Sequence, residues 1–236
     1  MEHTVRAFED ELNALTHKVT RMGGMVEAQL DNAVQSLVRR DSELAGETVA
    51  TDSRIDALEQ EINDFTVRLL ALRQPVADDL RMIVAALKIS SDLERMGDYA
   101  SNIAKRCLVL NQQPPVRPVA TVPRMAALVQ DITSAILDAY VERDLEKAAD
   151  AWERDKEVDE IYTSLFRELV TFMMEDPRTI TSCTHLMFIA KNLERIGDHA
   201  TNIAEATHYQ VTGKTLKMDR KSRIGEGPEL GSVLRL

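Results

Sequence analysis

The sequence predicts an all-α protein that consists of two tandem, similar three-helix bundles. The chain has 236 residues, of which 44% are hydrophobic and only 4% are aromatic. Because Ala, Leu, Ile, Val and ten Met residues supply the apolar content, helices are favoured over a β-sandwich or a barrel. Related segments recur about 100 residues apart, on either side of a proline-rich stretch, so the chain contains two copies of one unit.

The first copy covers residues 1–110 and contains three predicted helices. Apolar spacing and helix stop signals place them at residues 5–40, 42–72 and 75–110. Because short connections between long helices make neighbouring helices antiparallel, we expect an up-down-up bundle.

A linker follows at residues 111–122. Pro114, Pro115 and Pro118 interrupt helix and favour an extended, polyproline-like chain there. The tail, residues 213–236, holds four of the nine glycines and lacks helical periodicity, so we expect it to be mobile.

The second copy covers residues 123–212. Its three helices are predicted at residues 123–142, 144–174 and 177–211. Pro177 suits the first helical position of the last helix, as Pro75 does in the first copy, and Asp176 is a suitable N-cap.

Two pairs of segments define the duplication. "VRRDSELAGETVATDSRIDALE", which starts at Val38, resembles "VERDLEKAADAWERDKEVDEIY", which starts at Val141. "DLERMGDYASNIAK" and "NLERIGDHATNIAE" start 100 residues apart, at Asp92 and Asn192. The third helix of each copy therefore carries the same acidic motif.

The acidic motif forms a column of side chains four residues apart, on a flank next to the apolar seam of the helix. This column consists of Glu94, Asp98 and Asn102 in the first copy and of Glu194, Asp198 and Asn202 in the second. The second helices carry matching pairs, Asp52 with Asp56 and Asp155 with Asp159. If these faces meet, four carboxylates and an amide oxygen converge in each bundle.

Like charges four residues apart cost roughly 0.2–0.5 kcal/mol per pair, so the clusters need compensation. Arg95 and Arg195 adjoin the motif, but a side chain one position along points about 100° away. Two explanations stay open: a solvated charged face, or bound hard cations such as Mg, Ca, Mn or Fe, with Zn as a further candidate. Gly97 and Gly197 indicate the close approach of a neighbouring helix or a ligand.

The formal charge of −10 opposes binding to nucleic acid and to anionic lipid. The longest apolar run, "MIVAAL" at residues 82–87, is far shorter than the roughly 20 residues that span a bilayer. We therefore expect a cytoplasmic protein. His199 follows Asp198, but Tyr99 replaces it in the first copy, so we expect a surface or packing histidine.

The duplicated "LER-x-GD" and "NIA" segments, with "MMEDPRTI" and "YQVTGK" in the second half, closely resemble the PhoU family of bacterial phosphate-signalling regulators. The similarity covers about residues 3–214. It implies two three-helix bundles whose acidic motifs can hold multinuclear iron or zinc clusters, and the donor chemistry leaves Mg or Mn as alternatives. The ligands carried over are the eight carboxylates of the two clusters, and Asn102 and Asn202 are supporting residues.

The resemblance also implies a function and partners. Such proteins are negative regulators of the phosphate-starvation response that link the Pst phosphate transporter, through its ATPase PstB, to the membrane sensor histidine kinase PhoR. They are adaptors rather than enzymes, and contact with a membrane is expected only through these partners. We also expect a homodimer.

A carboxylate-dependent metalloenzyme of the hydrolase type is the alternative function. Di-iron bundle enzymes commonly use Glu-x-x-His, and here Gly97 and Gly197 stand at the histidine position. This weighs against redox di-iron chemistry but not against hydrolysis. The sequence shows no Gly-rich phosphate loop and no nucleophile with a base, which favours the adaptor.

Overall fold

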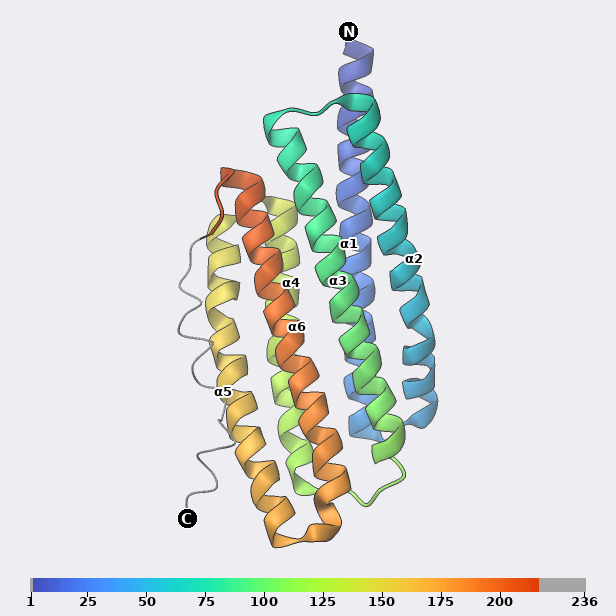
Figure 1. Cartoon of the computed structure of the whole chain (residues 1–236), viewed down its shortest axis with the longest axis vertical. Coiled ribbons are helices and arrows are strands. Elements are labelled where there is room, and N and C mark those ends of the chain that lie inside the picture. Colours follow the sequence, from blue (N-terminus) through green and yellow to red (C-terminus); the bar gives the residue numbers. More distant parts are fainter. Residues whose placement is uncertain (1, 217–236) are drawn as a thin grey trace.

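This computed structural model describes residues 2–216 of the protein. Six long helices with short connections form this part of the chain (Figure 1). The first half contains α1 (Glu2–Arg39), α2 (Ser42–Arg73) and α3 (Ala77–Leu110), and the second half contains α4 (Val122–Glu142), α5 (Leu145–Glu175) and α6 (Ile180–Thr212). Each half is an up-down-up bundle of three helices. The predicted all-α fold class with two similar bundles is confirmed.

The second helix of each half begins in the same way. The side chain of Asp41 accepts hydrogen bonds from two backbone amides in the first turn of α2, and Asp144 does so for α5. Arg40 (φ 55°) and Arg143 (φ 56°) adopt the left-handed conformation just before these caps. The duplication seen in the sequence is thus repeated in the local geometry of the turns.

The third helices begin later than predicted. Pro75 lies before α3, because Gln74 adopts a left-handed conformation and Val76 an extended one before the helix starts at Ala77. In the second half, Pro177 opens a short 3-10 helix, η2 (Pro177–Thr179), ahead of α6. Asp176 caps this turn, since its side chain accepts the amide of Arg178.

The linker is not extended throughout, so that prediction is wrong in part. A 3-10 helix, η1 (Arg117–Thr121), precedes α4, which begins at Val122. Pro118 fits near the start of such a turn, where its missing amide is not needed. Gly213, with φ 69°, ends α6, and residues 217–236 of the predicted mobile tail lie outside the described residues.

The two bundles share one hydrophobic core. Helix α3 packs along α6, and α1 packs against α4. The Lys88 ammonium lies 5.3 Å from the ring centre of Tyr209, and the Arg106 guanidinium lies 4.3 Å from that of Phe188. These pairs join the early part of each helix to the late part of the other, so α3 and α6 run antiparallel with the two acidic motifs near their middle.

Candidate functional site

The motif carboxylates of the first half lie together where α2 packs against α3. Burial raises the pKa of Asp56, and the negative charges of Asp52 and Asp98 raise it further. Burial also raises the pKa of Glu94. The negative charge of Asp98 raises it further, and that of Asp56 does so more weakly. The two acidic pairs therefore face each other, which is the arrangement that the sequence left conditional, and they repel each other.

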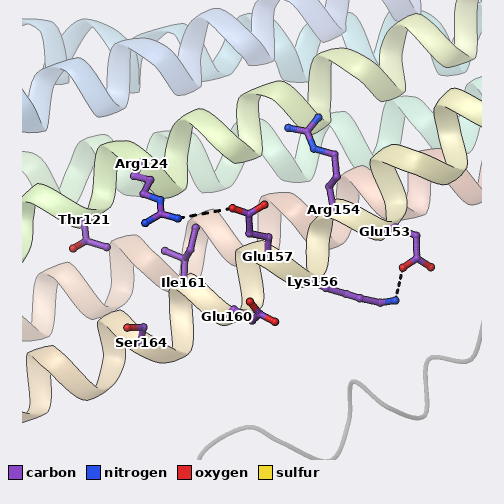
Figure 2. A pocket seen from close by; sticks show the side chains of 9 residues that line it. All are labelled: Thr121, Arg124, Glu153, Arg154, Lys156, Glu157, Glu160, Ile161 and Ser164. Atoms are coloured by element: carbon purple, nitrogen blue, oxygen red, sulfur yellow. Dashed lines mark hydrogen bonds and ion pairs between the residues drawn. The ribbon is translucent and has the colours of Figure 1, made fainter.

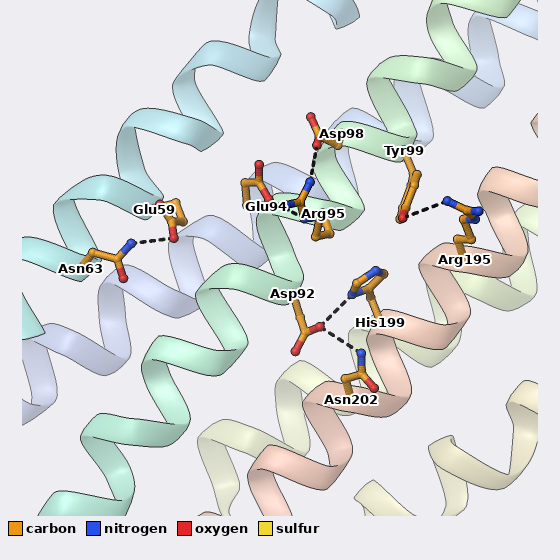
Figure 3. A network of polar contacts seen from close by, with 10 residues as sticks. All are labelled: Glu59, Asn63, Asp92, Glu94, Arg95, Asp98, Tyr99, Arg195, His199 and Asn202. Carbon is orange, nitrogen blue, oxygen red and sulfur yellow. Dashed lines mark hydrogen bonds and ion pairs between the residues drawn. The ribbon is translucent and has the colours of Figure 1, made fainter. Parts of the chain in front are cut away.

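A fifth carboxylate, Glu59, belongs to the same cluster. Its charge contributes to the raised pKa values of both Asp56 and Glu94, and Nδ2 of Asn63 donates to its Oε1 at 2.6 Å (Figure 3). Sequence analysis missed Glu59, although its spacing of three residues from Asp56 places it on the same helix face.

Arg95 contacts the cluster from its outer edge, which corrects the prediction that it points away. Its Nε lies 3.5 Å from Oε2 of Glu94, and its Nη1 lies 3.4 Å from Oδ2 of Asp98 (Figure 3). The long arginine side chain reaches both carboxylates, so the direction of its Cα–Cβ bond did not decide its contacts. Because the side chain is 58% exposed, these ion pairs are screened by water and weak.

Gln29 of α1 lies on the buried side of the first cluster. Its Nε2 donates to Oδ1 of Asp52 at 3.1 Å, and the residue is only 2% exposed. A Cβ atom on Gly97 would lie 3.2 Å from Oε1 of Gln29 and 3.1 Å from Cδ1 of Ile55. Gly97 thus permits close approach of neighbouring helices, which is one of the two roles predicted for it.

The cluster of the second half has a different environment. Asp155 is 1% exposed, and a Cβ atom on Gly197 would overlap its Oδ1. Burial raises the pKa of Glu194, and the charges of Asp198 and Asp159 raise it further, whereas the hydrogen bond from Lys191 lowers it. Lys191 was not identified from the sequence, although it stands three residues before Glu194.

The two asparagines of the predicted sites differ in position. Asn102 is exposed, whereas Nδ2 of Asn202 donates to Oδ1 of Asp92 on α3 at 3.1 Å (Figure 3). Nδ1 of His199 lies 2.7 Å from the same oxygen, and the rings of His199 and Tyr99 have centroids 5.6 Å apart. His199 and Asn202 therefore join the two halves, a role of His199 that agrees with the predicted packing histidine.

The donor set of the first cluster suits a hard cation, because carboxylate oxygens are the ligands that Mg²⁺, Mn²⁺ and iron favour. As placed, no three Asp, Glu, His or Cys side chains in residues 2–216 are positioned to hold a metal ion together. A cation in this cluster therefore requires its carboxylates to change rotamer. The multinuclear iron or zinc clusters stay a prediction.

Two open grooves lie between helices, and the second of them adjoins the first acidic cluster. One, of about 670 Å³, runs between the start of α4 and the middle of α5, where Arg124 and Glu157 approach to 4.0 Å (Figure 2). Lys156 pairs with Glu153 at its edge. The other, of about 520 Å³, lies between α1 and α2, and Gln29 contributes to its lining. Both grooves lie between the first and second helices of a half, so they occupy corresponding places.

Helices in the described part of the chain lack the combination of length and apolar content that a membrane crossing requires.

Comparisons with known proteins identify relatives along both halves. A family model described as "PhoU domain" matches residues 19–107 and 122–207. A phosphate-specific transport system accessory protein PhoU homolog from Caulobacter vibrioides is 54% identical over 220 residues, which cover 93% of this chain and 96% of that protein. A protein of the same description from Zymomonas mobilis is 49% identical over 214 residues, covering 91% of this chain and 90% of that protein.

Solved structures agree with these matches. The crystal structure of PhoU from Pseudomonas aeruginosa superimposes with a TM-score of 0.84 at 41% identity, over 88% of this chain and all (100%) of that chain. The phosphate transport system regulatory protein PhoU from Streptococcus pneumoniae gives a TM-score of 0.83 at 30% identity, over 89% of this chain and 100% of that one. Sequence, fold and duplicated motif agree: the chain belongs to the PhoU family.

Proposed function

We propose that this protein is a cytoplasmic accessory regulator of phosphate-specific transport. It represses the phosphate-starvation response by linking the transporter, through its ATPase PstB, to the sensor histidine kinase PhoR. The observation that carries the proposal is the match of both halves to the PhoU domain, together with relatives that are named as accessory proteins of the phosphate-specific transport system. The fold offers two packed bundles as a scaffold for two partners.

Deletion of the gene tests the regulatory role. We expect phosphate-starvation genes to be expressed in phosphate-rich medium, and the full chain supplied in trans to restore repression. Unchanged expression in the deletion strain contradicts the proposal.

Capture experiments test the link to the two partners. We expect the purified chain to retain both PstB and the cytoplasmic part of PhoR, and sedimentation to give the mass of two chains. Retention of PstB without PhoR limits the role to the transporter. Retention of neither protein contradicts the proposed adaptor role.

We further propose that the acidic clusters bind divalent cations, either as iron or zinc clusters or as Mg²⁺ or Mn²⁺. The support is the group of carboxylates between α2 and α3, where burial and, after it, mutual repulsion raise the pKa values of Asp56 and Glu94. A bound cation would supply positive charge that relieves this repulsion. Elemental analysis of protein purified without chelator should find metal that is lost from the Asp98→Ala, Asp198→Ala double variant, and metal-free wild-type protein contradicts the proposal.

A further inference from the structure

The two acidic clusters differ at two corresponding positions. On the second helices, Glu59 of the first half corresponds to Tyr162 of the second half, 103 residues later. On the third helices, Ser91 corresponds to Lys191, 100 residues later. The first cluster therefore has one more carboxylate, and the second has an ammonium group that the first lacks.

Lys191, whose side chain is 40% exposed, pairs with Glu194 of the second cluster. Its Nζ is 2.6 Å from Oε1 of Glu194 and 2.6 Å from Oε2. The carboxyl group of Glu194 is only 13% exposed, and the same ammonium lies 5.3 Å from the ring centre of Tyr162. Tyr162 thus contributes an aromatic face to a cation, where the first half has a carboxylate. The second cluster contains its own counter-ion, held between α5 and α6.

The first cluster has no comparable ammonium within the described residues, because exposed Ser91 occupies the position of Lys191. Its basic neighbour is Arg95, which is 58% exposed and lies 3.4 Å or more from Asp98 and Glu94. Five carboxylates facing one peripheral guanidinium leave a larger uncompensated negative charge than four carboxylates of which one, Glu194, is paired with the Lys191 ammonium.

A second observation at the first cluster is independent of the carboxylates. Gln29 is 2% exposed, and its Oε1 accepts no hydrogen bond from residues 2–216, although its Nε2 is bound to Asp52. This oxygen lies beside Gly97, between the motif positions on α3. A buried amide oxygen without a donor is costly, and a hard cation or its water shell would satisfy it. The corresponding residue of the second half is Ile132, which has no such oxygen.

We infer that the two clusters are not equivalent: the first is an exchangeable site for a hydrated divalent cation, and Lys191 closes the second as a built-in counter-ion. The inference rests on the proposed cation binding and adds to it which half takes the ion. It assigns Ser91 and Lys191 as the residues that set this difference.

Exchange of the two residues tests the inference. Mn²⁺ is titrated into the full chain and free Mn²⁺ is counted by electron paramagnetic resonance. We expect Ser91→Lys to weaken Mn²⁺ binding by roughly tenfold or more, because it places a positive charge beside the site. We expect Lys191→Ser to add Mn²⁺ binding that the wild type lacks. Since Ser91 is exposed, its replacement leaves the fold intact, and the far-UV circular dichroism spectrum checks this.

Matched carboxylate variants locate the binding. Asp56→Asn should remove Mn²⁺ binding from the wild type, whereas Asp159→Asn should leave it unchanged and should remove only the binding gained in Lys191→Ser. Equal loss from Asp56→Asn and Asp159→Asn, or undiminished binding by Ser91→Lys, overturns the inference while cation binding itself stands. A wild type that binds no Mn²⁺ overturns both this inference and the proposed cation binding. The adaptor role is tested separately by the capture of PstB and PhoR.

Discussion

Three carboxyl groups of the acidic clusters, those of Asp56, Glu94 and Glu194, have raised pKa values because they are partly buried and lie near other carboxylates. A carboxyl group whose folded-state pKa lies above its unfolded value favours folding when it is protonated. This contribution is fully present below the ordinary carboxyl pKa and is lost as the pH rises through the raised value. At neutral pH these groups therefore oppose folding, and the motif is kept at a cost in stability.

Neutralising one such group should stabilise the protein at neutral pH. We expect Asp56→Asn to increase the free energy of unfolding at pH 7 by roughly 0.2–0.5 kcal/mol, through relief of repulsion from Asp52 and Asp98. The gain should shrink as the pH falls and vanish by about pH 3, where the wild-type carboxyl is protonated in both states. Urea unfolding followed by circular dichroism measures both. Asp64→Asn, on the exposed side of α2, is the control, and a gain that does not change with pH contradicts this explanation.

Asp92 joins the two halves through His199 and Asn202. Its side chain is 17% exposed and that of His199 is 21% exposed, so removal of the carboxylate takes one contact each from two partly buried polar groups. We expect Asp92→Ala to lower the free energy of unfolding by about 1–2 kcal/mol. Asn192→Ala, at the corresponding position of α6, is the matched control. An equal loss from both substitutions would show that the contacts of Asp92 are not the cause.

At the scale of helices, glycines mark where the elements approach most closely. A Cβ on Gly23 would lie 2.6 Å from Cδ1 of Leu137, at the contact between α1 and α4. A Cβ on Gly97 would likewise contact Ile55 of α2, and one on Gly197 would contact Asp155 of α5. A Cβ on Gly24 would have no neighbouring atom within 4 Å. Only some helical glycines are therefore required for packing.

Alanine substitutions distinguish the glycines that are required for close packing from those with open surroundings. We expect Gly197→Ala to lower the free energy of unfolding by about 1–3 kcal/mol, because the new methyl group overlaps the buried carboxylate of Asp155. Gly97→Ala should cost less, since Ile55 and Gln29 would have to shift by only a few tenths of an ångström. Gly24→Ala should instead gain about 1 kcal/mol of helix propensity. Thermal unfolding measures all three, and a stabilised Gly197→Ala would contradict the close approach.

The sequence predicted most of the helices well because their boundaries depend on local signals. The prolines and the Asp176 cap are read directly from the chain, whereas the Asp41 and Asp144 caps were identified only in the structure. The start of α3 was missed, since the turn depends on the left-handed conformation of Gln74 and the extended Val76, neither of which has a glycine or cap signature. The 3-10 turn at Arg117–Thr121 was missed because prolines allow an extended chain and a tight turn alike.

For the whole molecule, the packing of the halves was not predicted, because apolar periodicity defines a buried face but not the partner that covers it. Four-residue spacing placed each acidic pair on one face of its helix but did not decide whether the faces meet, and the structure brings the pairs together. Glu59 and Lys191 were identified only in three dimensions, although comparison of the two copies position by position would have singled out Ser91 against Lys191. Gln29 and Asp92 gave no such signal, since each acts through a helix that is distant in sequence.

The shared core predicts that the halves unfold together. The single tryptophan, Trp152, is buried in the second half, whereas circular dichroism reports all helices. We expect the urea transitions measured by Trp152 fluorescence and by circular dichroism to coincide, as two-state unfolding requires. A fluorescence transition at a different urea concentration would show that the bundles unfold independently.

The antiparallel contact of α3 with α6 is related by an approximate twofold axis, near which Tyr99 and His199 meet. In a dimer of identical halves, each residue on such an axis faces its own copy, so an acid and a base cannot be paired there. Fusion of the halves into one chain removes this restriction. Tyr99 and His199 use that freedom, because two different residues occupy equivalent positions, and the contact of Asp92 with His199 is made only once, since their counterparts are Asn192 and Tyr99. The linkage in one polypeptide thus lets a nearly symmetric architecture hold two different residues at its axis and two chemically different sites.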